Sequence, residues 1–368
     1  MKEKIRAFFA DENKRKNFIF LCATVVALAL IILIPSLFPK DTGENKEKQQ
    51  YKSYSFEYFD TVSTVIGYAE SGDEFEKISK DAFLLLDEYH KLFDIYNEYE
   101  GINNLCTVNK LYDGQHKAIK VDRKIIDMLL YAKEMYALTD GRVNVAMGSV
   151  LSIWHDYRTA GIDEPYKAEL PPMDKLTEAA KHTNIDDLVI DEENCTVYLS
   201  DPLMKLDVGA IAKGYAVEMV ARSLEEKKVS NFVLNIGGNI RAIGPKASGE
   251  AWKTGVENPT NTDEYIAYLK VTEESVVTSG SYQRYYVVGG KEYHHIINKD
   301  TLMPSEGLLS VTVICKSSAL GDALSTALFC MSLEDGMALV NAMEGVEALW
   351  VTEDEVVHYS DNFDDYKY

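Results

Sequence analysis

An apolar run near the N-terminus is the strongest constraint that this sequence places on its fold. Residues 18–38, FIFLCATVVALALIILIPSLF, are 21 consecutive residues without a charge. At about 1.5 Å per residue, a helix of this length spans the hydrocarbon core of a bilayer. The sequence therefore predicts a transmembrane anchor at 18–38, so that any globular fold is formed by the rest of the chain.

The charges around this run predict its orientation. Six Lys and Arg residues and three acidic residues precede it, and the positive-inside rule then places 1–17 in the cytoplasm as a short tail. Residues 39–51 are polar and lack an apolar period, which indicates a linker, so the folded domain is expected at 52–368 on the outer side of the cell membrane. A cleaved signal peptide is the alternative, although no small-x-small cleavage pattern follows the run closely.

Composition limits the partners of the folded part. The chain has 368 residues, 46% of them hydrophobic, which is enough for a sizeable core. The formal charge of −21 argues against a nucleic acid as a partner. Four cysteines lie beyond the apolar run without CxxC or Cys/His spacing, so no zinc site is predicted and their disulfide pairing stays open: Cys106, Cys195, Cys315 and Cys330.

Helical and strand patterns alternate along the domain. Helices are expected at 73–93, 122–138, 210–227 and from Gly321 onward in GDALSTALF. Strands are expected at 54–69, on both sides of a turn at Glu193 and Asn194, on both sides of the glycines in NFVLNIGGNIRAIG, on both sides of Gly289 and Gly290, and in LLSVTVICK. The pattern predicts an α+β fold with mixed, mainly antiparallel sheets and packed helices.

Two segments predict a strand, a tight turn and a helix start in succession: LDVGAIAKGYA at 206–216 and CKSSALGDALSTA at 315–327. The first turn of a helix offers free N–H groups that favour phosphate. Gly209 and Ala210 would let a backbone carbonyl face outward, and Lys213 lies within a turn of them to hold a phosphate. A structural glycine turn with a surface lysine is the alternative. Neither segment has the spacing of a Walker loop or a dinucleotide fingerprint.

Asp322 and Thr326 are four residues apart in the last expected helix. Their side chains therefore lie on one face, a turn apart, and present two hard oxygen atoms of the kind that Mg²⁺ prefers. Alternatively, Asp322 favours the helix N-terminus and Thr326 is an ordinary polar-face residue. Spacing alone leaves both interpretations open.

Histidines and aromatic residues supply further candidates. In YHHIIN, His294 and His295 are expected in a strand with side chains on opposite faces. Beside a phosphate site, such a histidine could act as an acid, a base or a donor to phosphate oxygen, although packing histidines are common in strands. Trp154, Tyr282 and Tyr285 offer ring faces on which a flat heterocycle could stack, or they belong to the core.

Five segments in order resemble the ApbE-type FAD:protein FMN transferases: LDVGAIAKGYAVE, NFVLNIGGNIRAIG, VTSGSYQRYY, YHHIINKDTLMP and ALGDALSTALF. The likeness extends over about 52–350. It implies an α+β domain that transfers the FMN half of FAD to a threonine or serine hydroxyl of a target protein, with Mg²⁺ as cofactor and AMP as the second product. Some members of the family instead hydrolyse FAD to FMN and AMP.

The resemblance also implies roles for particular residues. Asp322 and Thr326 match the family's metal-binding side chains, and Ala210 matches the residue whose carbonyl completes the Mg²⁺ site. Asp322 and His295 are the expected catalytic residues. The expected flavin-nucleotide contacts are Asn97, Asn144, Lys213, Tyr282 and His295.

The sequence departs from the family pattern away from the metal positions. Phe59 and Asp60 precede Thr61 where the family usually has Met-Gly-Thr, and Asn144 stands where an aspartate is common. HIINKDTL replaces the usual HIIDPxTG. The chain shows no acceptor motif of its own, so the expected partner is a separate extracytoplasmic FMN-accepting redox protein. Two alternatives remain: an FAD pyrophosphatase, and a surface protein that binds flavin without chemistry.

Overall fold

An eight-stranded antiparallel sheet with the order β1-β2-β6-β7-β10-β13-β14-β15 organises the fold. This computed structural model describes residues 47–111 and 117–368, and 48–368 form one compact unit. Its strands are β1 Gln49–Tyr58, β2 Thr61–Ala69, β6 Phe232–Ile236, β7 Asn239–Ile243, β10 Ser275–Gly280, β13 Leu308–Cys315, β14 Glu347–Thr352 and β15 Val357–Tyr359. The order places β10 between β7 and β13, so segments far apart in the sequence lie side by side.

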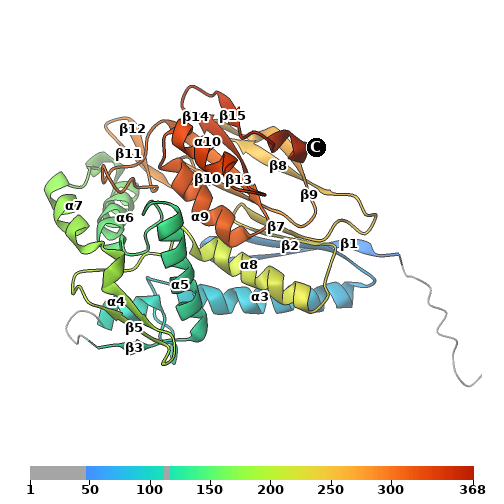
Figure 1. Ribbon diagram of the computed structural model, residues 1–368, viewed down its shortest axis with the longest axis horizontal. Helices are drawn as coiled ribbons and strands as arrows, with labels where there is room; N and C mark the ends of the chain where they lie inside the picture. The colour runs from blue at the N-terminus through green and yellow to red at the C-terminus, as the bar shows by residue number, and fades with distance from the viewer. Residues whose placement is uncertain (1–46, 112–116) are drawn as a thin grey trace, which may run out of the picture. The chain divides into compact units, whose positions relative to one another are not determined.

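Helices cover one face of this sheet (Figure 1). Helix α3 packs on β1 and β2, α8 on β6 and β7, and α9 on β10 and β13. The helices of this layer are α3 Gly72–Phe93, α8 Ala212–Glu226, α9 Ser318–Phe329 and α10 Leu333–Asn341. Helix α3 forms here because Ser71 caps its first turn and its apolar residues recur every three or four positions on the buried side.

A hairpin covers the opposite face of the sheet. It consists of β8 Trp252–Asn258 and β9 Asn261–Val271, and the short helix η4 Phe363–Tyr366 packs beside it. Along β6, Phe232 and Leu234 belong to the core under the helices, whereas Val233 belongs to the core under the hairpin. The strands of the sheet centre are therefore buried on both sides, which explains their almost continuous apolar sequence.

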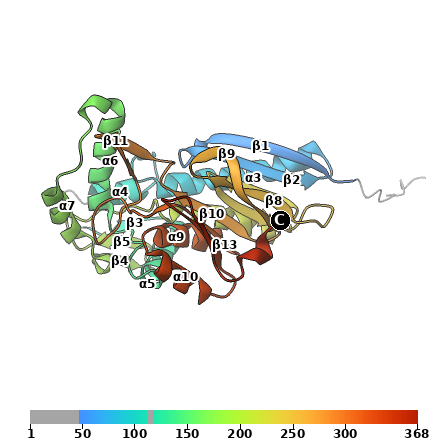
Figure 2. The same ribbon diagram turned by 90° about the horizontal axis from the view of Figure 1, so that it is seen from above.

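A smaller lobe lies at one end of the large sheet, as both views show (Figures 1 and 2). Its helices are α4 Leu105–Leu111, α5 Arg123–Leu138, α6 Gly148–Asp163 and α7 Met173–Ala179, with the short helices η1 Pro165–Lys167, η2 Ala180–His182 and η3 Ile185–Asp187. A three-stranded sheet consists of β3 Ile119–Lys120, β5 Thr196–Leu199 and β4 Leu188–Asp191. A separate hairpin consists of β11 Tyr285–Val288 and β12 Lys291–His294. Trp154 and Tyr286 pack in the core of this lobe.

The predicted α+β class with mainly antiparallel sheets is confirmed, but two local expectations were wrong. Residues 54–69 are not one strand, because Phe59 and Asp60 adopt left-handed φ angles of 53° and 51° and turn the chain between β1 and β2. The strand expected before α8 is absent in the described chain, where only an isolated bridge joins Lys205 to Met147. The four cysteines of the folded part are free, three of them buried.

The predicted anchor at 18–38 and tail at 1–17 lie outside the described residues, as does most of the predicted linker at 39–51. Strand β1 already begins at Gln49. Across residues 47–111 and 117–368, no helix combines the length and the apolar character needed to cross a membrane.

Candidate functional site

Helices α8 and α9 touch at Gly214. A Cβ atom on this glycine would lie 2.3 Å from Cβ of Asp322 and 2.4 Å from the carbonyl oxygen of Ser318, so only glycine permits this approach. The backbone N–H of Gly214 donates to Oδ2 of Asp322 at 2.7 Å, and Nζ of Lys213 lies 3.3 Å from Oδ1. The two segments in which the sequence predicted helix starts therefore meet, and Asp322 of α9 forms the contact with α8.

Asp322 does not lie at the start of its helix. Helix α9 begins at Ser318, where the hydroxyl of Ser317 accepts from the N–H of Leu320, so the small-residue run SSAL forms part of the first turn. Asp322 is in the second turn and only 5% exposed. The alternative interpretation of Asp322 as a residue of the helix N-terminus is thus wrong. A carboxylate this buried requires charged or N–H partners, which α8 provides.

Thr326 lies one turn beyond Asp322, at the end of strand β10. Its Oγ1 atom is 3.4 Å from Oγ of Ser279, which is in turn 2.8 Å from Oγ of Ser325. The two serines thus bring the C-terminal end of β10 to the face of α9 that carries Thr326. Sequence reasoning did not single out Ser279, although it belongs to the VTSG segment on which the family resemblance partly depended.

A side chain of α4 fixes the turn before α8. The side chain of Asn109 accepts from the N–H of Leu206 at 2.8 Å and donates to its carbonyl at 2.9 Å. Within the described chain, we find no hydrogen bond to the carbonyl oxygen of Ala210. This oxygen therefore remains able to accept a ligand three residues before Lys213.

Asp207 is a second acidic residue in this turn that the sequence reasoning did not select. Its Oδ1 accepts from the N–H of Gly209 at 2.9 Å, and its own N–H donates to the carbonyl of Val145 at 2.8 Å. Burial raises the pKa of the Asp207 carboxyl above its usual value. An acid whose pKa is raised is a common feature of functional sites, and its signal in the sequence was the LDVG segment itself.

His295 lies directly after β12, whereas only His294 is in the strand as expected. Nδ1 of His295 is 3.2 Å from the carbonyl oxygen of Arg284. Burial, together with the positive charges of Arg284 and Arg158, lowers the pKa of His295 to about 3. The ring is therefore neutral near pH 7, with Nδ1–H donating to the carbonyl and Nε2 left as an acceptor.

Two other expected nucleotide contacts are engaged in local structure. Asn97 is exposed, and its side chain donates to Oδ2 of Asp94 at 3.0 Å. Asn144 donates to the carbonyl of Thr183 at 2.9 Å and accepts from the N–H of Ala146 at 2.9 Å. Asn144 stands next to Val145, whose carbonyl binds the N–H of Asp207, and its amide both donates and accepts within this segment.

The aromatic candidates separate into core and surface. Trp154 is buried, and its Nε1–H donates to the carbonyl of Leu302 at 2.9 Å, so it is a core residue. Tyr282 packs against Gly280 at the end of β10, where burial raises its pKa. Tyr285 is exposed. No hydrogen bond in the described residues joins Tyr282 to Asp322 or Lys213, so its role in stacking stays a prediction.

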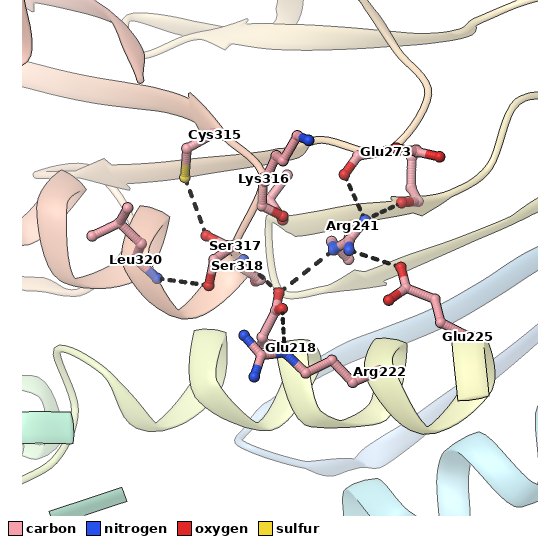
Figure 3. A network of polar contacts seen from close by, with 12 residues as sticks. Glu218, Arg222, Glu225, Arg241, Glu273, Cys315, Lys316, Ser317, Ser318 and Leu320 are labelled. Atoms are coloured by element: carbon pink, nitrogen blue, oxygen red, sulfur yellow. Dashed lines mark hydrogen bonds and ion pairs between the residues drawn. The ribbon is translucent and has the colours of Figure 1, made fainter. Parts of the chain in front are cut away.

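A buried ionic network fixes the start of α9 against α8 and β7 (Figure 3). Oε2 of Glu218 accepts from the N–H of Ser318 at 2.9 Å and lies 3.5 Å from Nε of Arg241. Glu218 and Arg241 are 4% and 6% exposed. The other partners of Arg241 are the carbonyls of Ala242 and Glu273 and the carboxylate of Glu225. This network sets the register of α9 one turn before Asp322.

The predicted metal ligands are all oxygen donors, as a hard divalent cation prefers. The predicted set combines one carboxylate, the Thr326 hydroxyl and the Ala210 carbonyl, the ligand types that Mg²⁺ takes. Nowhere in 47–111 and 117–368 do three or more His, Cys, Asp and Glu side chains gather in a metal-binding arrangement. A site with a single carboxylate would therefore depend on the phosphates of a substrate for further ligands.

The family model described as ApbE family matches residues 59–350. The chain belongs to the ApbE family. A relative from Klebsiella pneumoniae (strain 342), named FAD:protein FMN transferase, is 32% identical over 272 residues, covering 71% of this chain and 81% of the relative. A protein of the same name from Treponema pallidum (strain Nichols) is 32% identical over 257 residues, covering 66% of this chain and 69% of the relative.

Solved ApbE structures share the fold. The ApbE protein of Thermotoga maritima superposes with a TM-score of 0.75 at 28% identity, covering 87% of this chain and all of that one. The flavin transferase ApbE of Vibrio cholerae has a TM-score of 0.69 at 22% identity, covering 87% of this chain and 99% of that one, and supports the fold alone. The family resemblance seen in the sequence is thus confirmed, and the relatives' shared name describes a transferase.

Proposed function

We propose that this ApbE protein transfers the FMN half of FAD to a threonine or serine hydroxyl of an extracytoplasmic redox protein and releases AMP. The observation that carries the proposal is the meeting of Asp322 with Lys213 at the contact of α8 and α9, with Thr326 one turn away. Negative and positive groups that converge on one point at a helix start suit a phosphate and its counterion. The names of the relatives support the same activity.

Asp322, Thr326 and the carbonyl of Ala210 would hold Mg²⁺, which would neutralise charge on the FAD diphosphate as the bond breaks. Lys213 would bind a phosphate oxygen. Its contact with Asp322 is 3.3 Å, longer than the about 2.7–2.9 Å of a strong charged hydrogen bond, so the ammonium group can exchange this partner for phosphate.

The reaction breaks the P–O bond that joins the FMN phosphorus to AMP and forms a new phosphoester to the acceptor hydroxyl. The hydroxyl oxygen attacks in line, AMP leaves with the bond's electron pair, and the hydroxyl proton must pass to a base. His295 supplies a neutral Nε2 acceptor for that proton. The negative diphosphate would raise the pKa of His295 from about 3 and so increase its basicity.

The test combines the purified protein, FAD, Mg²⁺ and an extracytoplasmic FMN-accepting domain. AMP release together with a fluorescent acceptor band in a denaturing gel supports transfer. AMP with free FMN would support the alternative in which the same bond is broken by water, an FAD pyrophosphatase. Stable FAD without AMP would leave only the flavin-binding alternative. The substitution Asp322→Asn, which keeps the shape of the side chain, should abolish AMP release, and an unchanged rate would refute the site.

We further propose that residues 18–38 anchor the protein in the cell membrane with residues 52–368 outside the cytoplasm. The length of the apolar run and the excess of Lys and Arg before it support this topology. A reporter enzyme that is active only outside the cytoplasm, fused after Tyr368, tests the orientation. Activity of the reporter in the membrane fraction is expected, and its recovery in the cytoplasmic fraction would contradict the proposal.

A further inference from the structure

A contact between α6 and β11 brings two arginines to the border of the site. A Cβ atom on Gly161 would lie 2.5 Å from the ring of Tyr286, so the helix and the strand pack very closely at this point. Arg158 lies one turn before Gly161 on α6, and Arg284 lies two residues before Tyr286. Both arginines therefore flank the same packed contact.

These two arginines differ from the others in the described chain. Arg123, Arg142, Arg222 and Arg241 each form an ion pair with a carboxylate. Within 47–111 and 117–368 neither Arg158 nor Arg284 has such a pair. Nη2 of Arg158 instead lies 3.1 Å from Nδ1 of His155. Arg284 is exposed and Arg158 is half-buried, so both guanidinium groups are open to a ligand. Two neighbouring positive groups without a carboxylate favour the binding of an anion from outside the chain.

The electrostatic environment agrees with this geometry. Burial and the charge of Arg284 lower the pKa of Arg158 below its usual value, because both disfavour a second positive charge in this region. Asp207 acts on Arg158 in the opposite direction, but the two form no ion pair within the described residues. Both arginines also act on His295, so this positive region borders the proposed catalytic residue.

The adjacent loop supplies an aromatic wall. The ring of Tyr96 lies 4.9 Å from the ring of His155 at an interplanar angle of 31°. The hydroxyl of Tyr96 is 3.5 Å from Nδ1 of His155, the atom that Arg158 also approaches. His155 therefore connects Tyr96, in the loop after α3, to Arg158. These contacts limit the orientations of the Arg158 side chain.

We propose that Arg158 and Arg284 form an anion subsite that binds a phosphate group of the nucleotide, on the α6–β11 side of His295. The inference rests on the proposed function only in taking that nucleotide to be FAD or its product AMP. A guanidinium group binds two phosphate oxygens at once, which a lysine cannot do. Together with Lys213 on the α8 side, the subsite would hold the phosphates from two directions, and His155 would position Arg158.

Equilibrium binding tests the subsite without turnover. FAD binding is followed by flavin fluorescence, and AMP and inorganic phosphate binding by calorimetry, all with EDTA and without acceptor. Arg158→Gln and Arg284→Gln should each weaken FAD binding about tenfold or more, since each removes a charged hydrogen bond. Arg123→Gln is the matched control, because it removes the same charge from an exposed pair with Asp127. It should bind FAD as the wild type does.

The results separate the possible ligands and the two proposals. If AMP binding also falls about tenfold, the subsite holds the AMP phosphate, and if only FAD binding falls, it holds the FMN phosphate. Wild-type affinity of both glutamine variants for FAD would overturn the inference. Where a glutamine variant has a lower melting temperature, Arg158→Lys and Arg284→Lys keep the charge and should still weaken FAD binding several-fold. A wild-type protein that binds FAD but releases no AMP would refute the transferase alone.

Discussion

Replacing Glu218 with alanine tests how the start of α9 is fixed. The substitution removes the acceptor of the Ser318 N–H and the carboxylate that lies 3.5 Å from Nε of Arg241. Arg241 is only 6% exposed, so its guanidinium cannot turn to water. The carbonyls of Ala242 and Glu273 and the carboxylate of Glu225 remain as its partners.

The size of the effect follows from these contacts. Breaking a buried ion pair from one side costs about 3–5 kcal/mol. Because Arg241 keeps its other partners, we expect the lower end, about 3 kcal/mol, for Glu218→Ala. Glu218→Gln keeps an oxygen for Ser318 and loses the charge, and should cost about 1–2 kcal/mol. Glu225→Gln, at a partner that is 41% exposed, should cost less than about 1 kcal/mol.

Urea unfolding monitored by circular dichroism measures these differences, provided that the dependence on urea is the same for all variants. The expected order of destabilisation is Glu218→Ala, then Glu218→Gln, then Glu225→Gln. AMP release should fall in the same order, because α9 carries Asp322. A Glu218→Ala protein within about 1 kcal/mol of the wild type, or no less stable than Glu225→Gln, would refute the account of α9.

Three further predictions concern single residues. Gly214→Ala should destabilise the fold by more than about 2 kcal/mol and stop AMP release, because its Cβ would lie 2.4 Å from the backbone of Ser318, and a wild-type urea midpoint would contradict this. Asp60→Gly should raise stability by up to about 1 kcal/mol, because Asp60 has a φ of 51°, and an unchanged or lower melting temperature would contradict it. The pKa of His295 is about 6.5 in the unfolded chain and about 3 in the folded protein. The free energy of unfolding is therefore highest above pH 6.5 and falls as the pH decreases from 6.5 towards 3. The loss reaches up to about 2 kcal/mol at pH 5. His295→Gln should reduce that loss in urea titrations at pH 7 and pH 5, and an equal loss would show that the folded protein does not hold His295 as a neutral ring.

The sequence predicted elements that carry strong local signals. Helix α5 and helix α3 begin at side-chain caps and bury one apolar side, and the glycines at 237–238 and 289–290 turn hairpins with positive φ angles. Helix α6 was missed because it starts at Gly148 without a capping side chain. The turn at Phe59 and Asp60 was missed because Phe is unusual in left-handed backbone and no glycine follows it.

The sequence predicted only those parts of the site that depend on local spacing or on the family resemblance. Asp322 and Thr326 share a helix face, so their spacing is visible in the sequence, and the family resemblance pointed to Lys213. The contact of α8 with α9 at Gly214 depends on the packing of the two helices on one sheet, which no local pattern records. The same holds for Arg158 and Arg284, which only the packing of α6 on β11 brings together.

Intact-mass spectrometry of the acceptor domain shows directly whether this protein transfers FMN to another protein. The domain is incubated with FAD, Mg²⁺ and the purified protein, and AMP is measured in the same sample. We expect the acceptor to gain the mass of one FMN phosphoester on a threonine or serine, with an equal amount of AMP, and the Asp322→Asn variant to give neither. An unmodified acceptor beside wild-type AMP release, or full modification by the Asp322→Asn variant, would contradict this expectation.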